Sequence, residues 1–200
     1  MIDVIKNKVE KLEELYKDER VKQIIDVLNS VIDKNEEITK FVKQYQPFPA
    51  NKSMIDEYIK KHKIKVKKKR KFGVISIAKL LKEGGDARNA WMNYNSMIDN
   101  TLWLSVNFDK NTEEQKVIKL SHEINHHILS QKIGVVRYDA AYLASQWFRL
   151  AIELSAYKVN YEHSDSKDLY ISQLATKFIK DYDIKMKYED LTKLITSCYT

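Results

Sequence analysis

The sequence predicts a mostly helical α+β fold, in which a small sheet of about three strands lies beside one long helix and a helical extension occupies the N-terminus. Only four glycines and two prolines occur in 200 residues, which leaves little material for loop-rich β architecture. Apolar residues recur at helical spacing over most of the chain. Short stretches between residues 63 and 108 instead alternate apolar and polar side chains, as half-buried strands do.

The composition is that of a water-soluble globular protein, with 44% hydrophobic and 32% charged residues. No apolar run approaches the roughly 18 residues of a membrane span, and the first six residues lack the layout of a signal peptide. Cys198 is the single cysteine, which favours a reducing compartment. We therefore expect a soluble, cytoplasmic protein without a membrane span, and the sequence leaves its oligomeric state open.

The N-terminal part is predicted to be helical over residues 2–45, because it contains no glycine or proline and shows apolar stripes at helical spacing. Gln46-Pro-Phe-Pro-Ala50 is the clearest boundary in the sequence. This predicts an N-terminal helical segment over residues 1–46 and a second, larger domain over residues 51–200.

The basic character of the chain belongs to one short segment. Residues 51–71 carry ten basic and two acidic side chains, a net charge of +8, whereas the whole chain carries +7. Within this segment, residues 60–71 suggest two interpretations. They form either an edge strand protected from pairing by its lysines or a patch that contacts phosphates. We favour the edge strand, because no aromatic side chains alternate with the lysines to stack nucleic acid bases. Nucleic acid is therefore a possible but not a favoured partner.

The predicted sheet and its flanking helices follow in order. Ser53 is expected to cap a short helix that ends near His62, and residues 73–82 suggest a strand that turns into a short helix. Residues 88–94 and 100–108 are candidate strands joined as a hairpin. In the second of these strands Leu102 and Leu104 lie on one face, which predicts a half-buried strand.

A long helix over residues 112–132 carries the most informative motif. Thr112 is placed to cap its N-terminus, and Gly134 follows its end. It contains His122-Glu-Ile-Asn-His126, an H-E-x-x-H motif. Two histidines four residues apart project from one helix face and can bind one zinc ion, while Glu123 can reach the open position on the metal. His127 lies about 100° around the helix from His126, so we interpret it as a packing residue.

A zinc site of this type needs a third protein ligand. The extension H-E-x-x-H-x-x-G-x-x-H is excluded, because Leu129 and Lys132 occupy its glycine and histidine positions. Glu153 lies 27 positions after His126, on a helix expected to bury Leu143, Trp147, Leu150 and Leu154. A surface pair with Arg149 is the competing explanation for Glu153. Ala156, one turn further on, favours the ligand, because a small residue lets the two helices approach closely.

Asp139 and Glu162 are the reserve candidates for the third ligand. A peptide carbonyl attacked at such a site also needs a hydrogen-bond donor for its developing oxyanion. Tyr157, Tyr161, Tyr138 and Tyr142 are candidates, and we prefer Tyr157 because it shares the helix face of Glu153.

The segment Ser121-His-Glu-Ile-Asn-His-His-Ile-Leu129, together with Glu153-Leu-Ser-Ala-Tyr157, resembles the gluzincin metallopeptidases, and within them the ImmA/IrrE-like group. The resemblance covers about residues 88–162. It implies a zinc metalloendopeptidase that hydrolyses polypeptides, with His122, His126 and Glu153 as metal ligands and Glu123 as the general base and acid. Tyr157 stands where that group usually has Asn, and no helix-turn-helix module accompanies the motif.

Two other classes of function stay open. The chain could be a nucleic-acid-associated protein that uses residues 60–71, or a zinc-binding protein without catalytic activity. Metal analysis separates the first alternative from a peptidase, and replacement of Glu123 separates the second.

Overall fold

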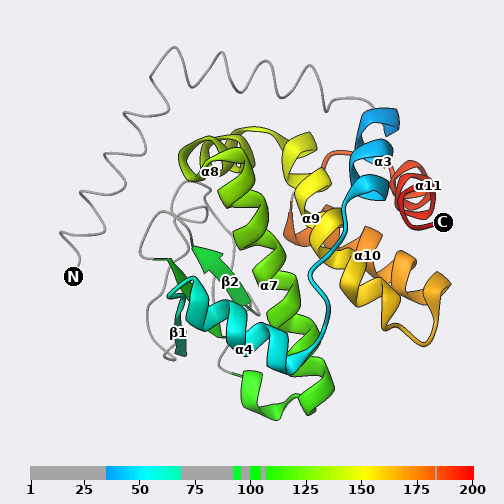
Figure 1. Cartoon of the computed structure of the whole chain (residues 1–200). Coiled ribbons are helices and arrows are strands. Elements are labelled where there is room, and N and C mark those ends of the chain that lie inside the picture. Colours follow the sequence, from blue (N-terminus) through cyan, green and yellow to red (C-terminus); the bar gives the residue numbers. More distant parts are fainter. Residues whose placement is uncertain (1–34, 69–91, 96–99, 105–106, 183) are drawn as a thin grey trace.

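The computed structural model describes residues 35–68, 92–95, 100–104, 107–182 and 184–200. These residues form a mostly helical α+β fold, which confirms the predicted class (Figure 1). The predictions made for residues 1–34 and 73–82 lie outside the described residues. The helices are α3 (Asn35–Gln44), α4 (Lys52–Lys61), α7 (Glu113–Ile133), α8 (Val135–Ala144), α9 (Gln146–Glu162), α10 (Lys167–Asp181) and α11 (Tyr188–Tyr199).

The long helix α7 runs through the middle of the molecule, between the sheet and the C-terminal helices (Figure 1). Its N-terminus is a capping box, in which the Thr112 side chain accepts from the backbone N–H of Gln115 and the Gln115 side chain accepts from the N–H of Thr112. Gly134 ends the helix with a positive φ of 95°, a conformation that suits a residue without Cβ. Both predicted ends of this helix are confirmed.

The described sheet has three strands, β1 (Lys65–Lys68), β2 (Met92–Asn95) and β3 (Thr101–Leu104), in the order β1-β3-β2. β3 pairs in parallel with β1 and antiparallel with β2, as a hairpin between β2 and β3 requires. Leu102 and Leu104 are buried, but Thr101 is buried as well, so the simple alternation fails at the start of β3. After β3 the chain makes a short 3-10 helix, η2 (Phe108–Lys110), before α7 begins.

β1 lies at one edge of this sheet, and the side chains of Lys65, Val66 and Lys67 are exposed. An edge strand exposes unpaired backbone groups, and lysines discourage its pairing with another chain. The position of β1 therefore fits the interpretation that we favoured for the start of the basic segment. Residues 69–71 lie outside the described residues.

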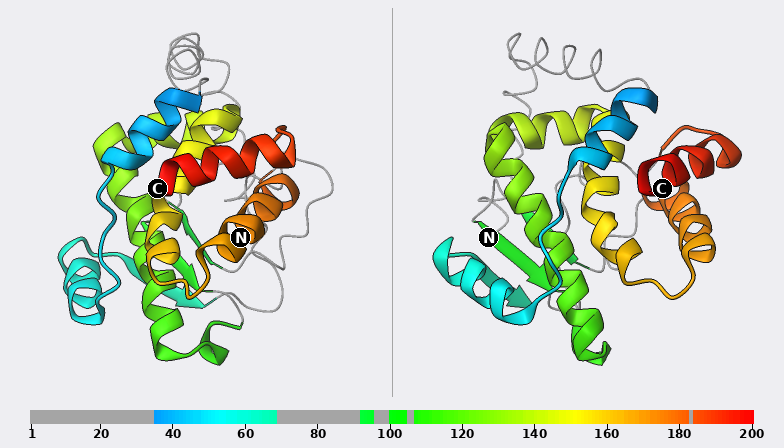
Figure 2. Two further views of the ribbon diagram at one scale, coloured as in Figure 1. Left: turned by 90° about the vertical axis from the view of Figure 1, so that its right-hand side faces the viewer. Right: turned by 45° about the vertical axis from the view of Figure 1, so that its right-hand side comes forward.

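The main hydrophobic core lies between α3, α9, α10 and α11, and Figure 2 shows α3 beside α11 although they come from opposite ends of the chain. Ile38 and Val42 of α3 are fully buried against Leu150 and Leu154 of α9. Residues 35–44 of the predicted N-terminal segment therefore share a core with the C-terminal helices. The predicted division at residues 46–51 otherwise stays a prediction.

Two local predictions were wrong. The helix α4 is capped by Asn51, whose side chain accepts from the N–H of Met54, and Ser53 lies inside the helix. Leu143 belongs to α8 and not to the helix of Glu153, because Ser145 accepts from the N–H of Phe148 and starts α9 as a new helix. Among the described residues no helix is long and apolar enough to cross a membrane.

Candidate metal site

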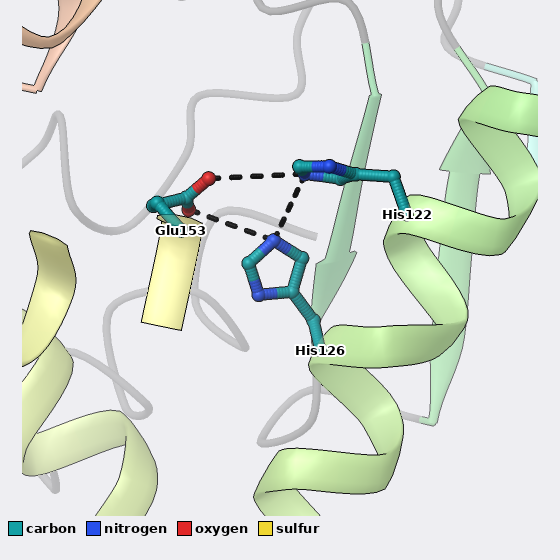
Figure 3. A group of neighbouring side chains, drawn as sticks. All are labelled: His122, His126 and Glu153. Carbon is teal, nitrogen blue, oxygen red and sulfur yellow. Dashed lines mark hydrogen bonds and ion pairs between the residues drawn. The ribbon is translucent and has the colours of Figure 1, made fainter. Parts of the chain in front are cut away.

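His122 and His126 of α7 face Glu153 of α9, and all three side chains are buried (Figure 3). The two histidine Nε2 atoms are 3.1 Å apart. Glu153 places Oε2 3.7 Å from Nε2 of His122 and Oε1 3.6 Å from Nε2 of His126. The structure thus brings together the three predicted ligands, while the reserve candidates Asp139 and Glu162 are not members of the group.

The spacing of these atoms can be compared with that of a metal site. Ligand atoms held about 2.0–2.2 Å from a tetrahedral ion lie roughly 3.3–3.6 Å from one another. The two histidine Nε2 atoms, at 3.1 Å, are slightly closer than this, and each lies 3.6 or 3.7 Å from a different oxygen of Glu153. Glu153 Oε2 is buried without a hydrogen-bond partner, and a carboxylate oxygen removed from water needs a compensating positive charge. The group could therefore hold a metal ion.

The surface pair between Arg149 and Glu153 is not formed. Glu153 is only 3% exposed, and Arg149 donates instead to the backbone carbonyl oxygens of Tyr142, at 2.7 Å, and Tyr182, at 3.2 Å. Ala156 is fully buried where α9 packs against α7, so the small residue does permit the close approach that the sequence suggested.

Two tyrosines from α8 contact the candidate ligands Glu153 and His126. The Tyr142 hydroxyl donates to Oε1 of Glu153, and the Tyr138 hydroxyl is 2.8 Å from Nδ1 of His126. Burial is the largest cause and the charge of Glu153 the next that raise the pKa of each tyrosine well above the usual value for tyrosine. Both hydroxyl groups therefore keep their protons. A histidine that presents Nε2 to a metal carries its proton on Nδ1, and Tyr138 is placed to accept it. Both residues had been predicted only as oxyanion donors.

His122 is held by α9 as well as by its own helix. Its ring lies 4.3 Å from that of Tyr157, centroid to centroid. Burial, then the neighbouring His126 and Lys177, lower the pKa of His122 well below its usual value, while hydrogen bonding to the Asn160 side chain and the Ala156 backbone acts in the opposite direction. The neutral imidazole is the form that binds metals.

Asn160 lies near His122, and no role was predicted for it. Its Oδ1 and the Nδ1 of His122 are both buried and lack a hydrogen bond of normal length and angle, although Asn160 influences the pKa of His122. Asn160 lies seven residues after Glu153, on the same face of α9. That spacing is the sequence signal that places it beside the ligands.

Tyr157, the preferred oxyanion donor, lies beside the ligands, and its hydroxyl is 3.1 Å from the hydroxyl of Tyr182. Burial and the charge of Glu153 raise the pKa of both tyrosines. Tyr182 was not predicted, because it lies 25 positions away in the turn after α10. Tyr161 instead stacks on Tyr199 at 4.7 Å, against the core of the C-terminal helices.

Glu123, next to His122, is 6% exposed. Its negative charge contributes to the raised pKa values of Tyr138 and Tyr157, after larger contributions from burial and Glu153, so its carboxylate lies within electrostatic range of both. His127 contacts Tyr58, with 2.8 Å between its Nδ1 and the hydroxyl, as expected for a packing residue.

A short strap, Tyr45–Phe48, ties the two ligand-bearing helices together. Asn125, between the two histidines, accepts from the Tyr45 hydroxyl at 2.8 Å and from the Phe48 N–H at 2.7 Å. Lys158 of α9 donates to the carbonyl oxygen of Tyr45 at 3.0 Å. The proline-containing segment, which the sequence presented as a boundary, is thus bonded to both α7 and α9.

Two cavities of the described structure lie elsewhere. One of about 620 Å³ lies between α3 and α11 and is lined by Thr39, Trp147 and Leu194 among others. A smaller one, of about 300 Å³, lies beside the first half of α7. None of the three candidate ligands lines either of them. The site is therefore identified by its donor atoms and not by cavity size.

Fold and site together define an α+β protein with a buried His-His-Glu group that could hold a metal ion. No protein-family model matches the chain, and no curated protein or solved structure matches it significantly. The resemblance to gluzincin metallopeptidases accordingly stays a prediction from the motif.

Proposed function

We propose that the protein is a zinc-dependent endopeptidase of the gluzincin type. The observation that supports it best is that Nε2 of His122, Nε2 of His126 and the Glu153 carboxylate lie close enough together to share one metal ion. Two imidazoles and one carboxylate form a donor set used by catalytic zinc sites, which keep a fourth position for water or substrate. Glu123 directly follows the first ligand, as a general base in such a site must.

Zinc, when bound, supplies Lewis acidity that activates water and polarises a peptide carbonyl. Glu123 accepts a proton from the water while the water oxygen bonds to the carbonyl carbon. Glu123 then gives that proton to the leaving amine. One C–N bond breaks and one C–O bond forms, so Glu123 ends each turnover as it began. Tyr142 and Tyr138 hold Glu153 and His126 in place from the outer side.

Tyr157 is our proposed donor to the developing oxyanion. Its raised pKa keeps the hydroxyl protonated, and its ring already lies against His122. The neighbouring Tyr182 hydroxyl can accept the Tyr157 proton in the resting state, which keeps a buried hydroxyl satisfied until a substrate replaces that partner.

An extended polypeptide could be held by strand addition to the described sheet. β3 is paired on both sides, so it cannot receive another strand. β2 pairs only with β3 in the described sheet, and it packs against α7, the helix of the two histidines. Its outer backbone N–H and C=O groups would bind a substrate main chain next to the ligands.

The test compares the parent protein with Glu123→Gln, measuring cleavage of a peptide library and zinc content on the same samples. We expect the variant to keep its zinc and to lose about 10²–10⁴ in rate, because an amide cannot accept the proton of water. Glu162→Gln, at the exposed end of α9, is the matched control and should cleave like the parent. Equal cleavage by Glu123→Gln would remove the proposed mechanism.

A parent protein that binds zinc but cleaves no peptide would favour the alternative of a silent zinc-binding protein. The other alternative, a nucleic-acid-associated protein, gains no support from β1, because the edge position accounts for the exposed Lys65 and Lys67. Steeply salt-dependent binding of DNA or RNA would be its signature.

A further inference from the structure

Lys177 of α10 reaches the candidate site from a third helix, in addition to α7 and α9. Its Nζ lies 5.8 Å from the ring centroid of Tyr157 and 6.0 Å from that of Tyr182. The Tyr157 ring in turn lies 4.3 Å from the ring of the ligand His122. The ammonium group therefore lies near Tyr157, which borders His122, and near Tyr182, whose hydroxyl contacts that of Tyr157. It stays partly exposed, at 30% of its side-chain surface.

A second ammonium group lies on the same side of His122. Lys119 comes from α7, three residues before His122 and hence on the same helix face, and its Nζ donates to the Asn111 side chain at 2.5 Å. The charge of Lys177 lowers the pKa of Lys119, after the larger effect of burial, and it also contributes to the lowered pKa of His122. Lys177 is therefore close enough to both Lys119 and His122 for its charge to act on them.

Among the described residues, one anion lies beside Lys177. Asp181, on the same helix, lies 3.8 Å from Nζ but is 63% exposed. Ion pairs of this kind in water contribute little, because the solvent screens them. An anionic group bound between Lys177 and Lys119 would be attracted by both, in surroundings that are partly removed from water.

From this arrangement we infer that Lys177, with Lys119 nearby, forms a subsite for a substrate carboxylate close to the scissile bond. The inference rests on the proposed peptidase function and names its substrate class: peptides with Asp or Glu beside the cleaved bond, or with a free C-terminal carboxylate there. Lys177 is the specificity-determining residue, and its interaction with the rings of Tyr157 and Tyr182 orients it.

The first experiment uses the full-length, zinc-loaded protein and two matched peptide pairs. One pair differs by Glu against Gln beside a cleavage site found by library digestion, and the other by a C-terminal carboxylate against a carboxamide. We expect the parent to prefer an anionic member by about tenfold or more in kcat/KM. Whichever pair shows the preference identifies the source of the carboxylate. Lys177→Met should abolish it and Lys177→Arg should largely retain it, while Lys180→Met, a control at an exposed lysine one turn on, should leave it unchanged.

A second experiment needs no turnover. The hydroxamate of succinic acid and its neutral amide analogue are titrated into the zinc-loaded parent, Lys177→Met and Lys180→Met by calorimetry. We expect the parent and Lys180→Met to bind the anionic compound more tightly, and Lys177→Met to bind both equally. Discrimination without peptidase activity would uphold the carboxylate subsite and overturn the proposed function. Peptide cleavage and hydroxamate binding that both ignore the carboxylate would overturn the subsite alone.

Discussion

Replacing Asn125 with Leu should destabilise the protein by removing the bonds between α7 and the strap Tyr45–Phe48. Leu has a similar volume but accepts no hydrogen bond, so the buried Tyr45 hydroxyl and the partly buried Phe48 N–H both lose their acceptor. A buried donor left unsatisfied costs about 1–3 kcal/mol, so the two together predict a loss of roughly 2–6 kcal/mol. The measurement is urea unfolding of the metal-free protein, which should show a lower midpoint at an unchanged slope.

Tyr45→Phe provides the internal control for this prediction. In the parent it removes one hydrogen bond and should cost about 0.5–1.5 kcal/mol. In the Asn125→Leu protein it should be neutral or stabilising, because it removes a hydroxyl that has already lost its partner. A loss below about 1 kcal/mol for Asn125→Leu, or an equal cost of Tyr45→Phe in both proteins, would refute the reasoning.

Two further predictions concern residues around the ligands. Asn160→Leu should weaken zinc binding by about 10–100-fold, measured in competition with a chelating dye. Asn160→Asp keeps an acceptor for His122 and should retain most of the affinity. Equal zinc affinities in Asn160→Leu and the parent would contradict the role of Asn160. Burial, with a smaller effect of His62, lowers the pKa of His127 from 6.5 to about 4, so the unfolded chain takes up this proton first as the pH falls. The metal-free protein should therefore lose stability as the pH falls from about 6.5 to about 4. The His127→Gln protein, in which Gln can still accept from Tyr58, should lose less stability over the same range. Urea unfolding at pH 7 and pH 5 measures this, and an equal loss of stability in the two proteins would contradict the prediction.

The features of α7 could be predicted because their signals are local. Thr112, Gly134 and the apolar spacing between them fix both ends of the helix, and a separation of four residues suffices to place His122 and His126 on one face. Glu153 needed a long-range argument. Helical spacing and the small Ala156 made it the best candidate, but only the packing of α9 against α7 brings its carboxylate to the two histidines.

The contacts that surround the ligands depend on tertiary packing, and sequence spacing alone does not reveal them. Tyr138 and Tyr142 are four residues apart, which marks a common helix face, but nothing in that spacing shows that the face meets His126 and Glu153. Ser145 was overlooked because apolar residues continue at helical spacing through the break between α8 and α9.

The strap shows what the two prolines leave open about this segment. Pro47 and Pro49 end α3 and were interpreted as a domain boundary, since proline interrupts helices. Yet the backbone between them is held by Asn125, and Lys158 secures the end of α3. Proline indicates only the local conformation of the chain. The hydrogen bonds that hold this segment come from Asn125 and Lys158, about 80 and 110 positions later in the sequence.

Zinc content measured on four purified proteins tests the central claim most directly. We predict about one zinc ion per chain in the parent and in His127→Gln, whose altered side chain lies outside the group, and essentially none in His122→Ala and His126→Ala. A parent protein that holds no zinc when zinc is supplied, or a His122→Ala protein that keeps a full equivalent, would contradict the claim that His122, His126 and Glu153 form a zinc site.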